Sequence, residues 1–311
     1  MAVVSVVMSV FNGGELLAAA VESVLAQTFA DFEFIIIDDG STDRSVEVLH
    51  GYNDPRIILV RQENRGIAAA LNRGLELASG YYIARQDADD LSFPQRLTTQ
   101  TNYLDNHPEI AVLGTAALVI DSVGRPFSTF WPFTRHERLV KELLRGICPL
   151  MHGSVMMRRE AVRNVGGYNP AFGHAQDVEL WLRIAGRYRL GNIRDVLYQY
   201  RKHESSVTQL ARVDLKIKTF AQAGKFSTAT SPEEWKRFVE AFDREFSGTW
   251  RERAFEAETH LSKARVAIAR RDGAAAIRLL GAAVRLYPPL FAEVPGRVLR
   301  RIWRTILPTV G

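Results

Sequence analysis

Apolar runs and amphipathic segments alternate through the first third of the chain. The apolar runs predict strands and the amphipathic segments predict helices. The expected strands are residues 3–10, 32–37, 56–61 and 81–85, and the expected helices are residues 15–27, 43–50, 66–78 and 94–106. The run Phe34-Ile35-Ile36-Ile37 is apolar at every position, which is typical of a strand buried on both faces of a parallel sheet. The order of the elements therefore predicts an α/β fold with a doubly wound, mostly parallel sheet.

The pattern becomes mixed after Ile110. Short strands come first, with a helix near residues 136–145 and a strand near 153–157. A helix that starts near Asp177 precedes two short strands, at 188–193 and 196–200. From Ser205 the pattern is helical, and two segments, 256–270 and 274–286, are suited to a hairpin that looks like one tetratricopeptide-type unit. We expect an α/β domain over residues 1–210 and a smaller α-helical region over residues 211–311.

The composition is that of an ordinary globular protein, with 311 residues, 47% of them hydrophobic and 24% charged. Cys148 is the only cysteine, which excludes an internal disulfide and suits a reducing cytoplasm. Its apolar neighbours favour a buried packing role over that of a nucleophile. No stretch approaches the roughly 18 apolar residues of a membrane-spanning helix, and residues 1–11 read as a strand instead of a signal peptide. We expect a cytoplasmic protein that is not integral to a membrane.

Positive charge is concentrated in the last third of the chain. Residues 1–204 carry 21 basic and 24 acidic side chains, a net charge of −3, whereas residues 205–311 carry a net charge of +8. Residues 296–307 alternate arginines with apolar residues and include Trp303. This pattern fits a helix lying on the inner face of an anionic membrane, and it equally fits a docked terminal helix with a solvated basic face. Nucleic acid is not expected as a partner, because no aromatic platform accompanies the arginines.

Two acidic clusters each follow an apolar run. They are Asp38-Asp39-Gly40-Ser41-Thr42-Asp43 and Asp87-Ala88-Asp89-Asp90. Both clusters are compatible with simple turn chemistry. However, the carboxyl ends of strands in open α/β sheets are where ligands bind, and several acids that face one crevice need a cation or hydrogen-bond donors. Asp39 is therefore a candidate to bind a nucleotide base or ribose, and Asp87 with Asp89 to share Mg²⁺ or Mn²⁺ with phosphates.

Three further side chains are candidates for chemistry. Asp177 fits either a helix cap or a general base that takes a proton from an acceptor hydroxyl. His203 follows a strand and stands beside Arg201 and Lys202, which suits a phosphate or metal contact. His152 is a weaker candidate of the same kind, because a single histidine is more often structural or simply exposed.

Taken together, these segments resemble the family 2 glycosyltransferases, which are inverting enzymes of the GT-A fold. The resemblance covers roughly residues 3–204 and rests on ordered motifs, not on any single one. The motifs are Val4–Asn12, Ser23–Phe29, Asp38–Asp43, Asn64-Arg65-Gly66, Leu71–Gly74, Tyr82–Asp90, Pro94, Arg96-Leu97, Gly166-Gly167-Tyr168 and Gln176–Arg183. Ser9 stands where many members have Pro. Gln176 stands where many have Glu, which leaves Asp177 in place but removes a neighbouring acid and bears on acceptor preference.

The resemblance implies a role for each candidate. Asp177 would be the catalytic base, and Asp89 and His203 would bind Mn²⁺ or Mg²⁺. The nucleotide and its sugar would contact Ser9, Phe11, Asn12, Asp39, Arg65, Asn72, Asp87 and Ala88. Arg201 and Lys202, with His203, would close over the diphosphate. The donor would be a nucleotide-diphosphate sugar, with a UDP-sugar preferred, and the acceptor a saccharide or a lipid-linked saccharide, as in bacterial polysaccharide synthesis.

Other classes fit the sequence less well. A sugar-nucleotide pyrophosphorylase would need a basic, glycine-rich loop after the first strand, and a dinucleotide dehydrogenase would need G-x-G-x-x-G there. The turn at that place is Asn12-Gly13-Gly14-Glu15. An inactive scaffold that binds partners through its helical tail stays an alternative, although an inert protein has no reason to keep mutually repelling carboxylates.

Overall fold

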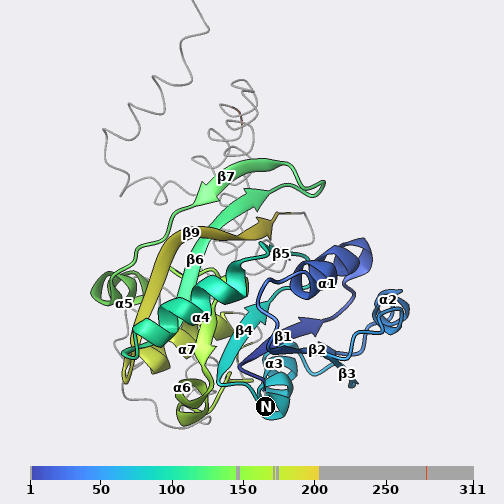
Figure 1. Ribbon diagram of the computed structural model, residues 1–311, viewed down its shortest axis with the longest axis horizontal. Helices are drawn as coiled ribbons and strands as arrows, with labels where there is room; N and C mark the ends of the chain where they lie inside the picture. Colours follow the sequence, from blue (N-terminus) through green and yellow to red (C-terminus); the bar gives the residue numbers. More distant parts are fainter. Residues whose placement is uncertain (1, 145–147, 171, 173–174, 203–277, 279–311) are drawn as a thin grey trace, which may run out of the picture. The chain divides into compact units, whose positions relative to one another are not determined.

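The computed structural model describes residues 2–144, 148–170, 172, 175–202 and 278 (Figure 1). The predicted domain boundary near residue 210, the helical region after it and His203 lie outside these residues. The strands are β1 (Val4–Val10), β2 (Phe32–Asp38), β3 (Ile57–Arg61), β4 (Tyr82–Gln86), β5 (Leu91–Ser92), β6 (Ile110–Ile120), β7 (Pro126–Phe130), β8 (Met156–Arg158) and β9 (Arg189–Arg201). The helices are α1 (Leu17–Leu25), α2 (Ser45–His50), α3 (Ile67–Leu77), α4 (Arg96–Asn106), α5 (His136–Leu144), α6 (Arg159–Asn164) and α7 (Gln176–Ala185), with 3₁₀ turns at Gly14–Leu16 and His152–Ser154.

One curved, mixed sheet organises the described residues. Its strand order is β3-β2-β1-β4-β8-β6-β9-β5, and β7 pairs with β6. Strands β3, β2, β1 and β4 are parallel, which confirms the prediction for the first part of the chain. Strand β8 then runs antiparallel to both β4 and β6 and joins the two halves of the sheet. The carboxyl ends of β1, β2 and β4 therefore meet at one edge, where the acidic clusters lie.

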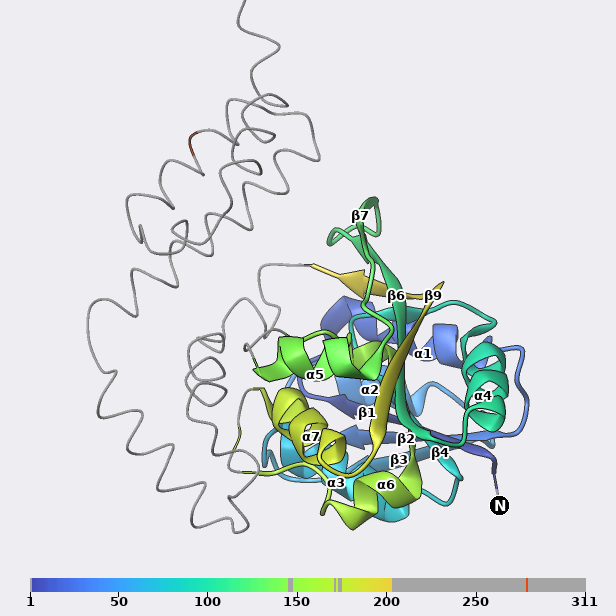
Figure 2. The same cartoon turned by 90° about the vertical axis from the view of Figure 1, so that its left-hand side faces the viewer.

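The central strands are buried on both faces because helices cover both. Val7, Ile37 and Ile83 face an apolar layer built with α3, α5 and α7. The alternate residues of the same strands, such as Met8 and Ile36, face a second layer built with α1 and α4. Figure 2 shows α5 and α7 on one side of β6 and β9, with α4 on the other. This two-layer covering explains why the strands read as continuous apolar runs.

The second half of the sheet corrects two predictions. Strand β6 is a single eleven-residue strand where short strands were expected. Strand β9 is also continuous, so the prediction of two short strands at 188–193 and 196–200 was wrong. The register of β6 against β9 passes from Gly114↔Asn192 to Ala116↔Val196, so β9 carries extra residues at this point. The exposed polar pair Arg194-Asp195 lies in this irregularity. Exposed polar residues occur in bulges as well as in turns, so this pair was read as a break between two strands.

In the part of the chain that the structure describes, no helix is long and apolar enough to cross a membrane.

Candidate active site

The turns after β1 and β2 hold each other in place. The Asn12 Oδ1 atom accepts the Thr42 backbone N–H at 2.8 Å, and the Asn12 backbone N–H donates to Ser41 Oγ at 3.0 Å. Asn12 adopts a left-handed backbone with φ of 53°, which an asparagine tolerates better than most residues. The next two backbone N–H groups, of Gly13 and Gly14, donate to side chains of the β2 turn as well. These contacts bring the predicted nucleotide residues of the two turns together.

Asp39 is buried and its carboxylate organises a third turn. Its Oδ1 atom accepts Gln62 Nε2 at 2.7 Å and the Arg65 backbone N–H at 3.0 Å. Its Oδ2 atom accepts the Gly66 backbone N–H at 2.8 Å, just before α3 begins at Ile67. Asp39 thus fixes the segment that carries Arg65, whose side chain is exposed.

Ser9 and Phe11 complete this side of the site. Ser9 lies at the end of β1, paired with Ile37 of β2, and is partly exposed. The Phe11 side chain is 53% exposed, which leaves its ring free to stack on a flat ligand.

The acidic loop Asp87–Asp90 after β4 rests on a buried arginine. Arg96 of α4 is 1% exposed and donates to five acceptors around this loop. They are Gln100 Oε1, Gln86 Oε1, Ser92 Oγ, and the carbonyls of Arg85 and Val155, at 2.7–3.2 Å. The Gln86 amide in turn donates to the carbonyls of Asp87 and Asp90. The loop therefore has a defined shape before any ligand binds.

The carboxylates of this loop crowd one another. Burial, with the charges of Asp87 and Asp89, raises the pKa of Asp90 well above its usual range. Asp90 Oδ1 accepts the Arg201 backbone N–H at 2.7 Å, and Arg201 Nε donates to the Asp89 carbonyl at 2.9 Å. Arg201 thus ties the end of β9 to the loop. Asp87 and Asp89 remain partly exposed, and Ala88 packs against the apolar layer that includes α1.

Asp87 is paired with a second buried arginine. Arg85 Nη2 lies 2.6 Å from Asp87 Oδ1, and the Arg85 side chain is 2% exposed. Its Nε and Nη1 atoms are buried without a hydrogen-bond partner. The Asp87 backbone N–H donates to the Tyr198 hydroxyl at 3.2 Å. Both contacts hold Asp87 with one carboxylate oxygen directed away from Arg85.

A histidine–tyrosine pair lies between Asp87 and Asp177. His152 Nε2 lies 2.8 Å from the Tyr168 hydroxyl. Burial, and then the charge of Arg85, lower the pKa of His152 to about 4, while Asp177 and Asp87 act in the opposite direction. Burial raises the pKa of Tyr168 well above its usual range, and the same two carboxylates add to this shift. Gly153, next to His152, lies against Asp87 Oδ2, and the His152 ring contacts Trp181 of α7, one turn after Asp177. The fold has thus brought together acids that are 90 positions apart in the sequence.

Asp177 lies in the first turn of α7. Ala175, which precedes the helix, adopts a left-handed backbone with φ of 58°. The Cys148 thiol donates toward Asp177 Oδ2 at 3.6 Å and to the Leu150 carbonyl at 3.1 Å. Burial, and then Asp177, raise the pKa of Cys148 well above its usual range, so the thiol stays protonated.

Arg183, paired with Glu179 within α7, holds this helix to the loop before it. Glu179 and Arg183 pair through two hydrogen bonds of 2.6 Å. Arg183 also donates to the carbonyls of Gly167 and Val165. The Asn72 side-chain amide pairs with the backbone N–H and C=O of Tyr168, at 2.8 and 2.7 Å. Asn72 therefore supports the Tyr168 loop, and its predicted contact with the donor is untested.

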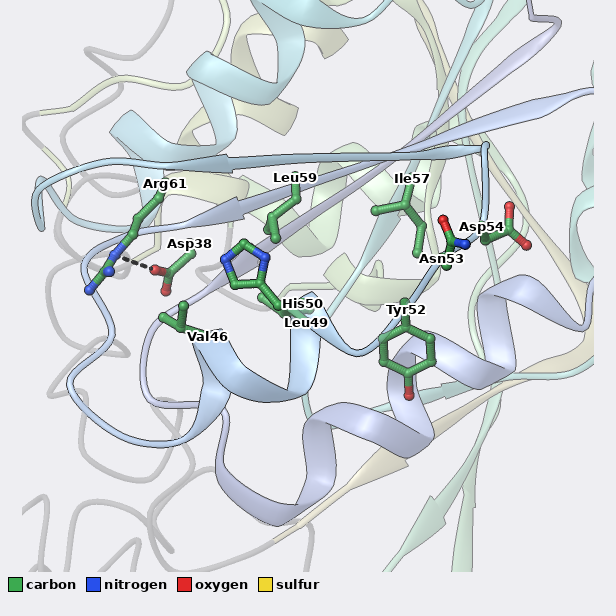
Figure 3. Close-up of a pocket in the computed structure, with 10 residues that line it drawn as sticks. All are labelled: Asp38, Val46, Leu49, His50, Tyr52, Asn53, Asp54, Ile57, Leu59 and Arg61. Carbon is green, nitrogen blue, oxygen red and sulfur yellow. Dashed lines mark ion pairs between the residues drawn. The ribbon is translucent and has the colours of Figure 1, made fainter.

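A separate pocket of about 350 Å³ lies between α2 and β3 (Figure 3). Asp38 lines it and pairs with Arg61 at 3.2 Å, on the opposite face of β2 from Asp39. The two neighbouring aspartates thus have different surroundings, because successive residues of a strand point to opposite faces.

The predicted metal residues were tested by their donor chemistry. Among the described residues, no group of three or more His, Cys, Asp or Glu side chains is arranged to hold a metal ion. Asp87 and Asp89 supply hard, partly exposed oxygens beside the buried Asp90. Such a pair fits Mg²⁺ or Mn²⁺, which keep several waters and take further ligands from substrate phosphates.

Sequence reasoning missed Arg85 and Tyr198, and it gave His152 little weight. Arg85 was read as part of a strand, and nothing local marked it as a buried cation. Only the alternation along β4 signals that Arg85 points toward the same side as Ile83, into the layer that contains Tyr168.

Comparisons with known proteins identify the family of this chain. The family model described as "Glycosyl transferase family 2" matches residues 5–166. The protein EpsE of Bacillus subtilis (strain 168) is 37% identical over 206 residues, which cover 64% of this chain and 73% of EpsE. The amylovoran biosynthesis glycosyltransferase AmsE of Erwinia amylovora is 29% identical over 211 residues, or 66% of this chain and 78% of AmsE.

Two solved structures share the fold. S. aureus TarS (residues 1–349) in complex with UDP has a TM-score of 0.58 at 15% identity, covering 92% of this chain and 91% of that chain. The mannosyltransferase PcManGT from Pyrobaculum calidifontis, in complex with GDP-Man and Mn²⁺, has a TM-score of 0.56 at 21% identity, covering 98% and 85%.

The family match and the fold thus define a glycosyltransferase of the GT-A fold. The chain belongs to glycosyl transferase family 2.

Proposed function

We propose that the protein is an inverting, divalent-metal-dependent glycosyltransferase. It moves a sugar from a nucleoside diphosphate donor, with UDP preferred, to a hydroxyl group of a saccharide or lipid-linked acceptor. One observation supports the proposal: Asp87 Oδ2 lies against Gly153, next to His152, and the His152 ring contacts both Tyr168 and Trp181 of α7, one turn after Asp177. The two carboxylates are thus proposed to serve one reaction centre, Asp87 towards the donor and Asp177 towards the acceptor.

The nucleotide is proposed to bind where the turns after β1 and β2 interlock. Phe11 offers an exposed ring for the base, and Ser9, Asn12, Asp39 and Arg65, which lie in or beside these turns, are proposed as further contacts. The neighbours named with UDP, UDP-GlcNAc and GDP-Man support a nucleotide-sugar donor, and two of these three ligands contain uridine. The base preference is part of the proposal.

Asp89, together with Asp87, is proposed to hold Mn²⁺ or Mg²⁺. When bound, the ion supplies positive charge against the departing diphosphate. The solved neighbour with GDP-Man and Mn²⁺ supports the use of a divalent ion. His203 is proposed as a further ligand of the ion, and Lys202 as a contact of the diphosphate. His203 lies outside the part of the chain that the structure describes.

Asp177 is proposed as the general base. Its carboxylate takes the proton of the acceptor hydroxyl as that oxygen attacks the anomeric carbon from the side opposite the diphosphate. The bond from the anomeric carbon to the phosphate oxygen breaks in the same displacement, and the diphosphate leaves with the electron pair. A single displacement inverts the configuration, so an α-linked donor gives a β-linked product.

The acceptor is proposed to be a growing polysaccharide. AmsE is named for amylovoran biosynthesis, which supports this substrate class. Contact of the basic residues 296–307 with an anionic membrane, where a lipid-linked acceptor would lie, belongs to the same proposal.

The test begins with UDP-, GDP- and dTDP-sugars and Mn²⁺, measuring the release of nucleoside diphosphate without acceptor and the transfer to saccharides. We expect release from one donor, abolished by EDTA and by Asp89→Ala. Asp177→Asn should bind the donor normally and lose transfer by at least about 100-fold, as for loss of a general base. Asp195→Asn, at an exposed position of β9, is the matched control. Product with retained anomeric configuration by NMR, or full transfer by Asp177→Asn, would refute the proposal.

A further inference from the structure

Three exposed apolar side chains lie close together in the sequence between β6 and α5. Val123, Trp131 and Phe133 are 68%, 63% and 46% exposed, and they are three of the six large hydrophobic side chains exposed in the described part of the chain. Single exposed apolar residues are ordinary on a protein surface. Two exposed aromatic side chains only two residues apart are less common, and exposed apolar surface of this kind often marks a binding site.

The Phe133 ring packs against an arginine. The Arg138 guanidinium lies over it, 4.5 Å from the ring centroid. Arg138 is in turn paired at 2.7 Å with Glu142, whose side chain is 3% exposed. One face of the ring is thus covered by a cation that is itself paired with Glu142, and almost half of the side chain stays exposed. An aromatic surface that is ordered in advance loses little entropy when a ligand packs on it.

A short series of contacts links this ring to the proposed base. The buried Asn192 side chain donates from Nδ2 to the Phe133 carbonyl at 2.8 Å and to the Pro149 carbonyl at 3.1 Å. Pro149 follows Cys148, whose thiol contacts Asp177. Helix α5, which begins three residues after Phe133, packs against α7, which carries Asp177. Figure 2 shows α5 and α7 side by side on the same side of β6 and β9.

The strand order separates this segment from the turns that are proposed to bind the nucleotide. The nucleotide turns follow β1 and β2, whereas Asn192 belongs to β9 and the aromatic segment follows β7, beyond β4 and β8 in the sheet. The acceptor hydroxyl must reach Asp177, so the rest of the acceptor extends outward from it. The C–H faces of a sugar ring are apolar and its hydroxyl groups are polar, so a sugar packs one face on an aromatic ring and keeps its hydroxyls in water.

We propose that Trp131 and Phe133 form a stacking platform for the acceptor saccharide. This inference rests on the proposed function and adds to it the place where the acceptor binds. The platform holds the sugar that receives the transfer, or the next one along the acceptor chain, while Asp177 acts on its hydroxyl.

Transfer to methyl β-glycosides of glucose, galactose and N-acetylglucosamine, and donor hydrolysis by water, are measured on the same variants. We expect Trp131→Ala and Phe133→Ala to lower kcat/KM for the glycoside about tenfold each, which corresponds to about 1.4 kcal/mol. Donor hydrolysis, KM for the donor and the melting temperature should stay unchanged, and Trp131→Phe should recover most of the transfer. Tyr81→Ala, at a 56% exposed aromatic position before β4, is the control.

A second measurement needs no turnover. Saturation-transfer NMR detects binding of the same glycosides to the full chain in the presence of UDP. We expect the signal from the sugar C–H protons to be lost in Trp131→Ala and kept in Tyr81→Ala.

The platform is refuted if both alanine variants bind and use the glycosides normally. It is also refuted if hydrolysis and transfer fall by the same factor, or if the variants lose only binding to anionic lipid vesicles. A chain that hydrolyses no donor but loses glycoside binding in Trp131→Ala would refute the proposed function and leave the platform supported.

Discussion

Arg96 offers the sharpest test of how the acidic loop is held. Burial lowers the pKa of Arg96 to about 10, so the guanidinium still carries its charge at neutral pH. Its partners lie on both sides of the loop, and the ring of Tyr198 lies 5.1 Å from the guanidinium carbon. Arg96→Met keeps much of the volume of the side chain and removes every donor.

The magnitude follows from the hydrogen bonds lost. Five acceptors around the loop lose a charged donor, and such hydrogen bonds contribute about 1.5–3 kcal/mol each when taken singly. The sum overstates the effect, because Gln86 Oε1 keeps the Ser92 hydroxyl and the Val155 carbonyl keeps the Arg85 backbone N–H. Removal of the buried charge also returns its desolvation cost. We therefore expect the free energy of unfolding to fall by about 3–5 kcal/mol, or roughly 6–20 °C in Tm.

The assay is urea unfolding of the parent chain, Arg96→Met and Arg96→Lys, with donor hydrolysis measured on the same samples. Arg96→Lys keeps the charge but loses the planar fork, so its stability should lie between the other two. Hydrolysis should fall in both variants, because the loop that carries Asp87 and Asp89 loses its support. A loss of less than about 1 kcal/mol in Arg96→Met, with full activity, would show that this reasoning is wrong.

Two further predictions concern the centre of the site. In Gly153→Ala, the added Cβ would lie 2.6 Å from Asp87 Oδ2 and would also meet the Tyr198 hydroxyl. We therefore expect at least about a tenfold loss of kcat/KM for the donor. Normal activity would contradict the position given to Asp87. Because the pKa of His152 is lowered to about 4, this ring stays neutral in the folded chain between pH 6.5 and 4. In the unfolded chain the same ring gains a proton in this window, so the free energy of unfolding should fall as the pH falls through it. In His152→Gln that part of the urea-measured slope should flatten while His50→Gln keeps it; an unchanged slope in His152→Gln would contradict the burial of this ring.

The parallel half of the sheet could be predicted because the residues of each strand show its pattern without reference to distant parts of the chain. The run Phe34–Ile37 before Asp38 is apolar throughout, the run Tyr81–Ala84 precedes Arg85, Gln86 and Asp87, and the acidic clusters that follow mark where each strand ends. These two facts suffice to place Asp39 and Asp87 at the same edge of the sheet. They say nothing about which hydrogen bonds the carboxylates make, since Gln62 and Tyr198 approach from other parts of the chain.

The remaining features depend on contacts between distant segments. Asn72 and Tyr168 are 96 positions apart, so no local pattern could show that the Asn72 amide is occupied by a backbone. The burial of Arg85 could not be predicted either, because a charged residue in a strand is usually expected at a surface. In β9, Arg194-Asp195 has the composition of a turn, and only pairing with β6 shows that the strand continues past it.

The way β9 ends sets a limit on how the chain can be shortened. Arg201 gives its backbone N–H to Asp90 and its side chain to the Asp89 carbonyl, and the Lys202 backbone N–H donates to the Ile120 carbonyl. An expression fragment cut before Arg201 would keep every strand residue that pairs with the loop's own β5, yet it would leave the carboxylate of Asp90 buried without this donor. A fragment intended to keep the loop in place must therefore extend at least through Lys202, and one intended to keep the proposed metal ligand His203 must extend further, with any fusion partner or affinity tag beyond it.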